Sequence, residues 1–209
     1  MQKYSLNYKN RGAGVFETFV CVILGLLAFL AVIRVAFGFT YIKVYVVGSS
    51  MEGTLAGADG KDRAGGDYVY IFRTSSPSRG DIVVIDTDGE PIIKRVIALG
   101  GDTVELKEGV LYLNGVETAE PYLKEEHNSP TNPKNTFSKI TVPEGEMFFM
   151  GDNRNVSVDS RSDKYRTLPV KNTMGVVADW SMSFKGLFTS INTFFDFKLG
   201  GGLSGFYGG

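Results

Sequence analysis

The chain has 209 residues, of which 43% are hydrophobic, and its formal net charge is -1. That length accommodates one membrane segment and one globular domain of about 150 residues, but not two full domains. The chain has 22 basic and 23 acidic residues, so its net charge provides no electrostatic attraction for nucleic acid. Nucleic acid is therefore not expected as a partner. The single cysteine, Cys21, excludes an internal disulfide and argues against a zinc site, so neither metal nor cofactor is expected.

The first predicted element is an apolar stretch at 18–39 with one charge, Arg34, near its far end. As a helix rising about 1.5 Å per residue it would cross a hydrocarbon core of roughly 30 Å, with the head of Arg34 reaching the interface. It runs into aromatic residues rather than a small-residue cleavage site, which favours a retained anchor. Three basic residues precede it and only Lys43 closely follows, which predicts a cytoplasmic segment at 1–17 in a protein that crosses the cell membrane once.

The region 40–182, predicted to be an extracytoplasmic domain, consists of short runs rich in Val, Ile, Tyr and Phe, bounded by Gly, Asp, Asn and Pro. Asn114-Gly115 predicts a tight hairpin, because both residues tolerate positive φ. We therefore expect a mostly β domain of antiparallel sheets, with long loops at 56–66 and 122–136. The predicted strands are 43–47, 67–73, 81–85, 92–99, 103–106, 110–113, 146–150 and 174–180.

The C-terminal region, 183–209, differs in kind. Apolar residues recur at helical spacing over 184–197, which predicts an amphipathic helix. Its apolar face suits packing on the domain and lying in the membrane interface equally well, so both alternatives stay open. The glycine-rich end, 200–209, is expected to be disordered.

Few residues are available for catalysis. Cys21 lies in the apolar stretch, and the only histidine, His127, lies in a polar segment typical of a solvated loop. A serine can still be a nucleophile if a neutral lysine is its base, since apolar surroundings disfavour the charged amine. Ser50 ends a strand-like run close behind the anchor, where Gly48 and Gly53 would let a bound chain approach. Taken alone, this pattern is more typical of a serine that hydrogen-bonds locally in a turn.

Lys94 is the candidate base. Strand alternation places it on one face with Ile92, Val96 and Ala98, and apolar neighbours would lower its pKa from about 10.4 by desolvation. The alternative is an edge strand with the heads of Lys94 and Arg95 exposed, and this run alone favours that alternative.

A polar cluster at 151–161 tips the balance toward catalysis, because Ser157 can orient a lysine amine while Asp159 and Arg161 brace the loop. In order and spacing, the three stretches resemble the type I signal peptidases, membrane serine proteases with a Ser/Lys dyad. The resemblance covers about 41–177. It is carried by Ser50-Met51, by Lys94-Arg95 with the following Gly100-Gly101-Asp102, and by the Gly-Asp-Asn-Arg to Asp-Ser-Arg sequence at 151–161.

The resemblance implies that Ser50 attacks the scissile carbonyl and Lys94 accepts its proton. The oxyanion would be held by the Ser50 backbone N–H and a second donor. Many relatives have a serine where this chain has Gly48, which offers only its backbone. Gly53 stands where a proline is common, which is expected to loosen the turn. Supporting roles fall on Asp152, Ser157, Asp159 and Arg161, and substrate contacts on Val47 and Met51.

The implied substrates are exported preproteins, bound as an extended strand and cut after a small residue, and the expected partners are these preproteins and membrane lipid, with the enzyme a monomer. A non-catalytic relative, tethered to the membrane as an assembly factor for secreted or pilus proteins, is the alternative. It requires Ser50 or Lys94 to be lost or unable to meet. A self-cleaving repressor-type protease would need a DNA-binding domain, and only the anchor precedes Tyr41.

Overall fold

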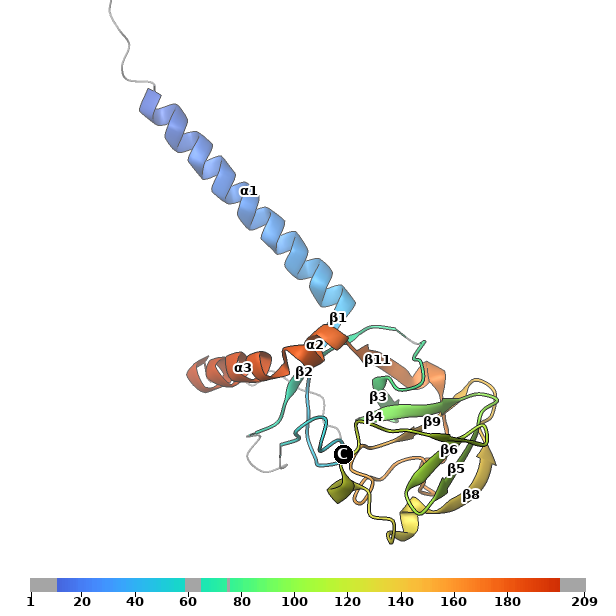
Figure 1. Ribbon diagram of the computed structural model, residues 1–209. Helices are drawn as coiled ribbons and strands as arrows, with labels where there is room; N and C mark the ends of the chain where they lie inside the picture. The colour runs from blue at the N-terminus through green and yellow to red at the C-terminus, as the bar shows by residue number, and fades with distance from the viewer. Residues whose placement is uncertain (1–10, 59–64, 75, 200–209) are drawn as a thin grey trace, which may run out of the picture. The chain divides into compact units, whose positions relative to one another are not determined.

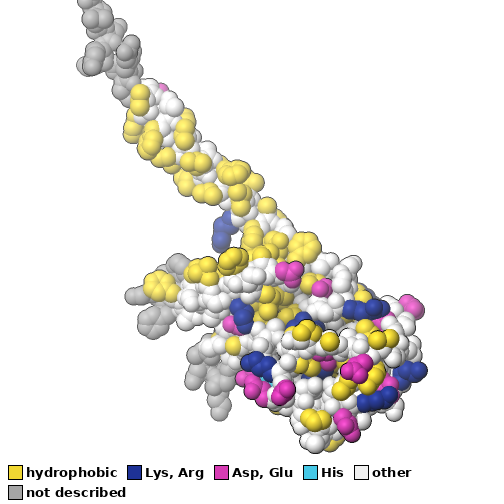
Figure 2. All heavy atoms as spheres, viewed as in Figure 1, with side chains coloured by type: hydrophobic (Ala, Val, Ile, Leu, Met, Phe, Trp, Pro, Cys, Tyr) yellow, Lys and Arg dark blue, Asp and Glu magenta, His cyan; other side chains and the backbone are white. Residues whose placement is uncertain are grey.

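The computed structural model describes residues 11–58, 65–74 and 76–199, and it divides into two compact units, Met1–Thr40 and Tyr41–Gly209. The first unit is helix α1 (Arg11–Thr40), in which Gly14–Thr40 is long and apolar enough to cross a membrane. Figure 2 shows hydrophobic side chains along the visible face of this helix, and exposed large hydrophobic residues recur from Val15 to Phe39 at spacings that cover its other sides as well. A helix that is apolar on every side has no water-facing surface, which fits a membrane anchor.

The second unit is built from two antiparallel sheets (Figure 1), as predicted. The larger sheet has the order β1-β2-β11-β3-β4-β9-β10 and the smaller one β7-β6-β5-β8. The strands of the larger sheet are β1 (Tyr41–Tyr45), β2 (Tyr68–Phe72), β3 (Ile82–Thr87), β4 (Glu90–Leu99), β9 (Glu146–Met150), β10 (Leu168–Pro169) and β11 (Thr173–Val177). Those of the smaller sheet are β5 (Thr103–Lys107), β6 (Val110–Leu113), β7 (Val116–Thr118) and β8 (Phe137–Thr141).

Short helices complete the unit. The 3-10 turns are η2 (Glu125–His127), η3 (Pro133–Asn135) and η4 (Val170–Asn172), and the α-helices are α2 (Asp179–Ser183) and α3 (Lys185–Leu199). The predicted hairpin at Asn114-Gly115 is confirmed, with φ of 54° and 81° between β6 and β7. The predicted strand 174–180 is wrong at its end, because Ser181 is buried beside β2 and accepts a hydrogen bond from the Tyr70 N–H, which holds this segment as helix α2.

Buried side chains lie on both faces of β4. Ile93 packs with residues of β1, β2 and β3, together with Met51 and Leu55 from the turn after β1. Towards its end, β4 has a register irregularity against β9 between Val96 and Ala98. Alternation breaks there, so Ile97 and Ala98 both join the cluster shared with the smaller sheet, and the prediction that Ala98 shares a face with Val96 is wrong.

Candidate active site

Ser50 and Lys94 meet in a buried contact. The Nζ atom of Lys94 lies 2.8 Å from Ser50 Oγ and 2.9 Å from the carbonyl oxygen of Ile93. Lys94 is completely buried and Ser50 is 8% exposed. The alternative of an exposed edge lysine is therefore wrong. The non-catalytic alternative required that Ser50 and Lys94 be lost or unable to meet, and neither condition holds.

Burial also sets the charge state of Lys94. Desolvation lowers the pKa of its amine from 10.5 to about 8, although the nearby carboxylate of Asp159 acts in the opposite direction. At 2.8 Å a neutral amine can accept the hydroxyl proton of Ser50. A short contact and a lowered lysine pKa are what a serine nucleophile with a lysine base would require.

The register of β4 brings Lys94 to the site. Lys94 pairs with Val83 of β3, whereas pairing with β9 begins one residue later, where Arg95 faces Met150. Among the described strands, the segment 90–94 thus has a sheet neighbour only on its β3 side. A strand edge of this kind offers backbone donors and acceptors to an added strand.

A tight turn after β1 holds Ser50. The N–H groups of Thr54 and Leu55 both donate to the carbonyl oxygen of Met51, closing one helical turn directly behind the serine. Met51 and Leu55 are completely buried in the core. Core packing therefore fixes the turn from below, and a substrate contact for the fully buried Met51 stays a prediction.

The loop 151–161 closes around Ser50. The Asn153 N–H donates to the Ser50 carbonyl oxygen at 3.0 Å, and the Gly151 N–H donates to Asp159 Oδ2 at 3.0 Å. A Cβ on Gly151 would lie 2.3 Å from the Ser50 carbonyl oxygen and 2.4 Å from Ser157 Oγ. Only glycine at this position lets the serine turn and the loop approach so closely.

Ser157 lies in this loop with its Oγ atom buried. That oxygen has no hydrogen-bond partner of normal geometry among the described residues, so the expected bond to the lysine amine is not formed here. The hydroxyl is nevertheless close enough to Asp159 to help lower the pKa of that carboxyl. Positioning of the amine by Ser157 stays a prediction.

Asp159 and Arg161 form a buried two-pronged ion pair, with Nε and Nη2 of Arg161 each 2.8 Å from a carboxylate oxygen. Burial would raise the pKa of Asp159, but the hydrogen bonds and charge of Arg161 outweigh it and lower the pKa. Arg161 also donates to the carbonyl oxygen of Arg154 at 2.8 Å. This ion pair holds the loop rigid and places charged groups beside Lys94.

Asp152 connects the three sequence stretches. Its carboxylate accepts two hydrogen bonds from Arg95, at 2.9 and 2.6 Å, and one from the Thr54 hydroxyl at 2.6 Å. Arg95, next to Lys94 in β4, is buried rather than exposed, and its guanidinium lies 3.8 Å from the ring centre of Tyr122. The turn of Ser50, the strand of Lys94 and the loop 151–161 are thereby tied to one carboxylate.

Glu120 and Tyr122 are site neighbours that the sequence did not reveal, and they contact Arg154 of the Gly-Asp-Asn-Arg sequence, to which no role was assigned. The Tyr122 hydroxyl donates to Glu120 at 2.6 Å, and Glu120 forms an ion pair with the completely buried Arg154. Burial raises the pKa of Tyr122. The one sequence signal for these contacts is the aromatic residue Tyr122 in a mostly polar segment. That signal does not indicate which surface the loop covers.

The expectation that His127 is solvated is wrong, because its side chain is only 15% exposed. Its Nδ1 atom is buried and has no hydrogen-bond partner within the described part of the chain. A Cβ on Gly53 would lie 3.0 Å from that nitrogen. Gly53 has a φ of +101°, which proline cannot adopt.

The predicted contribution of Gly48 to the oxyanion site is also corrected. Its N–H already donates to the carbonyl oxygen of Ala58 at 2.9 Å, and Val47 forms a parallel bridge with Ala58. The start of the 56–66 loop therefore occupies the one donor that Gly48 has. Val47 is half-buried in this bridge, and its substrate contact stays a prediction.

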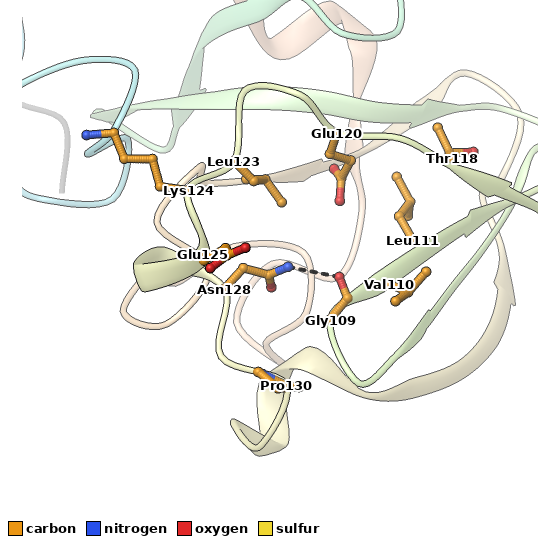
Figure 3. A pocket seen from close by; sticks show the side chains of 10 residues that line it. All are labelled: Gly109, Val110, Leu111, Thr118, Glu120, Leu123, Lys124, Glu125, Asn128 and Pro130. Carbon is orange, nitrogen blue, oxygen red and sulfur yellow. Dashed lines mark hydrogen bonds between the residues drawn. The ribbon is translucent and has the colours of Figure 1, made fainter.

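A pocket of about 460 Å³ lies on the smaller sheet, between β6 and the loop that contains η2 (Figure 3). Its lining includes Leu111, Glu120, Leu123 and Asn128, and the Asn128 side chain donates to the carbonyl oxygen of Gly109. Neither Ser50 nor Lys94 lines it. Within the described ranges, no cluster of three or more His, Cys, Asp or Glu could hold a metal ion.

A buried serine–lysine pair, carried by an antiparallel β domain that follows an apolar helix, is the arrangement expected of a serine peptidase without a catalytic histidine. Comparison with known proteins points the same way. Residues 16–180 match the family model described as signal peptidase, peptidase S26. The chain belongs to this family.

Several relatives bear the name signal peptidase I. The protein from Bacillus licheniformis is 36% identical over 172 residues, which cover 77% of this chain and 84% of that protein. Signal peptidase I S from Bacillus subtilis (strain 168) is 43% identical over 89 residues, 40% of this chain and 48% of that one. A crystal structure of a signal peptidase I from Enterococcus faecalis V583 covers 49% of this chain and 97% of its own, at 33% identity and a TM-score of 0.42.

Proposed function

We propose that this chain is a signal peptidase I that removes N-terminal signal peptides from exported preproteins, with Ser50 as nucleophile and Lys94 as general base. The observation that carries the proposal is the 2.8 Å contact between Lys94 Nζ and Ser50 Oγ in a buried site. With a pKa of about 8, roughly one amine in ten is neutral near pH 7, which is enough for a working base.

The proposed chemistry has two steps. As Ser50 Oγ attacks the scissile carbonyl carbon, its proton passes to Lys94 Nζ, and the resulting ammonium protonates the leaving amine of the mature protein. Water then attacks the ester on Ser50 and gives a proton to Lys94, which passes it to Ser50 Oγ as the acyl bond breaks. The signal peptide leaves with a free carboxylate, and the serine hydroxyl and the neutral amine are restored. The Ser50 backbone N–H would donate to the oxyanion in both steps.

The edge of β4 at 90–94 that borders no described strand suits an extended substrate. Backbone hydrogen bonds to 90–94 would hold a preprotein strand regardless of its sequence and lead its scissile bond to Ser50. Shallow pockets beside the serine would then select small side chains. We propose that the domain faces outward and the N-terminus lies in the cytoplasm, since basic residues concentrate before the apolar stretch 18–39, and that the enzyme acts as a monomer.

Full-length protein in detergent should cut a model preprotein once, directly after an alanine at the cleavage point. Phenylalanine at that position should lower the cleavage rate by about 100-fold or more, because a shallow pocket cannot admit the ring. Mass spectrometry of both products, with Ser50→Ala as blank, measures this. Equal product formation by the native chain and the blank would contradict the proposal.

The rate should also depend on pH in one direction. Only the neutral amine of Lys94 can accept a proton, so kcat/KM is expected to rise as pH rises through about 8 and to level off above it. Cleavage measured from about pH 6 to 10 tests this. A flat profile, or a rise centred near the ordinary lysine pKa, would mean that a desolvated Lys94 is not the base.

A further inference from the structure

Helix α3 has two different long faces. One face packs on the sheet. Phe188 lies edge-on to Tyr70 at 5.2 Å, the Thr189 hydroxyl accepts from the Tyr68 N–H, and Asn192 Oδ1 accepts from Lys43 Nζ at 2.8 Å. The packing alternative left open by the sequence is therefore correct for this face.

The other face carries large apolar side chains that are partly exposed. Phe184, directly before α3, and Leu187, Ile191 and Phe194 within it are spaced as one helical stripe and are 42–57% exposed. Figure 2 shows hydrophobic side chains in a row along this helix. A water-facing helix usually carries polar residues on such a stripe, so a contiguous apolar one indicates a surface that something covers.

The covalent connection between α1 and β1 limits how far the rim of the domain can lie from the end of α1. Tyr41, the first residue of β1, directly follows Thr40, the last residue of the apolar helix α1, and so stays within one peptide bond of its end in any arrangement of the two units. Tyr41 pairs with Phe72, which is 44% exposed, and its ring packs on Trp180 of α2. The rim of the domain that carries α2 and α3 is thus tethered to the end of α1.

We propose that the exposed stripe of α3 lies in the lipid–water interface, as a second membrane contact beside the spanning helix. A Phe-rich amphipathic helix held parallel to a bilayer buries its apolar face about 5–10 Å into the headgroup boundary. Helix α3 lies beyond the family match, which ends at residue 180, so this contact belongs to this chain rather than to the matched region.

The contact would bear on the active site. Lys185, the first residue of α3, donates to the carbonyl oxygen of Thr54 at 2.6 Å and pairs with Asp67 at 2.9 Å. Thr54 belongs to the turn that holds Ser50 and bonds Asp152. A bilayer-bound α3 would therefore hold the serine turn at a defined height above the membrane.

The test labels the full-length chain at single cysteines in a Cys21→Ala background. Leu187→Cys and Phe194→Cys probe the stripe, and Thr193→Cys, also exposed but about a third of a turn away from both, is the matched control. Each variant carries an environment-sensitive fluorophore in vesicles of phosphatidylglycerol and phosphatidylethanolamine. Quenching by nitroxide-bearing lipid should be at least about twofold stronger at 187 and 194 than at 193, with iodide in the water showing the reverse order.

Equal access of iodide to all three positions would overturn the proposal. So would protection of 187 and 194 from both quenchers together with energy transfer between fluorophores on two chains, since that result assigns the stripe to a second copy. Thermal unfolding of each labelled variant checks that the domain is intact. The readout does not involve cleavage, so it stands apart from the roles proposed for Ser50 and Lys94.

Discussion

Alanine at either Ser50 or Lys94 is expected to abolish signal-peptide removal, lowering kcat/KM by roughly 1000-fold or more. Ser50→Ala removes the atom that bonds to the substrate. Lys94→Ala removes the amine 2.8 Å away, and an unassisted serine hydroxyl is a poor nucleophile at neutral pH. Cleavage of a model preprotein by each purified full-length variant measures the loss.

Two controls separate chemistry from folding. Because the residues act as one unit, the double alanine variant should be no slower than either single variant. Lys94→Met keeps most of the side-chain volume but has no amine, so it should also be inactive. Its unfolding free energy should equal or exceed that of the native chain, because a buried amine is costly to desolvate. Substantial cleavage by Lys94→Met or Lys94→Ala would remove lysine from the mechanism.

The residues of the site could be predicted, but not their distances. The stretches of Ser50 and Lys94 each favour a structural role when taken alone, and they become a predicted site only together with the cluster 151–161 and the family resemblance that the three carry. Their meeting depends on sheet pairings such as Arg95 with Met150, which join segments far apart in the chain. Local patterns do not encode these pairings, so a lysine that pairs with a serine and one that lies on an exposed edge have the same local sequence.

The errors arose where periodicity carries little information. Strand β8 (Phe137–Thr141) is mostly exposed and shows no clear apolar alternation, so it was missed. The irregularity between Val96 and Ala98 breaks an alternation that the sequence shows as regular. His127 and Tyr122 lie in a polar loop, and only the tertiary fold reveals that this loop packs against the turn of Ser50 and covers Arg95.

Gly151→Ala is expected to lower kcat/KM by about 100-fold, the largest effect predicted for a residue without a reactive group. The added methyl would lie 2.3 Å from the Ser50 carbonyl oxygen and 2.4 Å from Ser157 Oγ, so the serine turn or the loop must move. A displacement of about 1 Å at a nucleophile is enough for a loss of this size. Overpacking should also cost about 1–3 kcal/mol of unfolding free energy.

The loss should come from the close contacts of the added methyl with Ser50 and Ser157, and not from a general intolerance of alanine. Gly151 is not in the left-handed region of φ, so alanine there suffers from lack of space alone. Gly186→Ala is the matched control, because its Cβ meets nothing within 4 Å and lies in helix α3, where alanine is favoured by about 1 kcal/mol. Cleavage assays well below the unfolding temperature should show near-native rates for Gly186→Ala. A Gly151→Ala variant of native activity would mean that the loop yields without displacing Ser50.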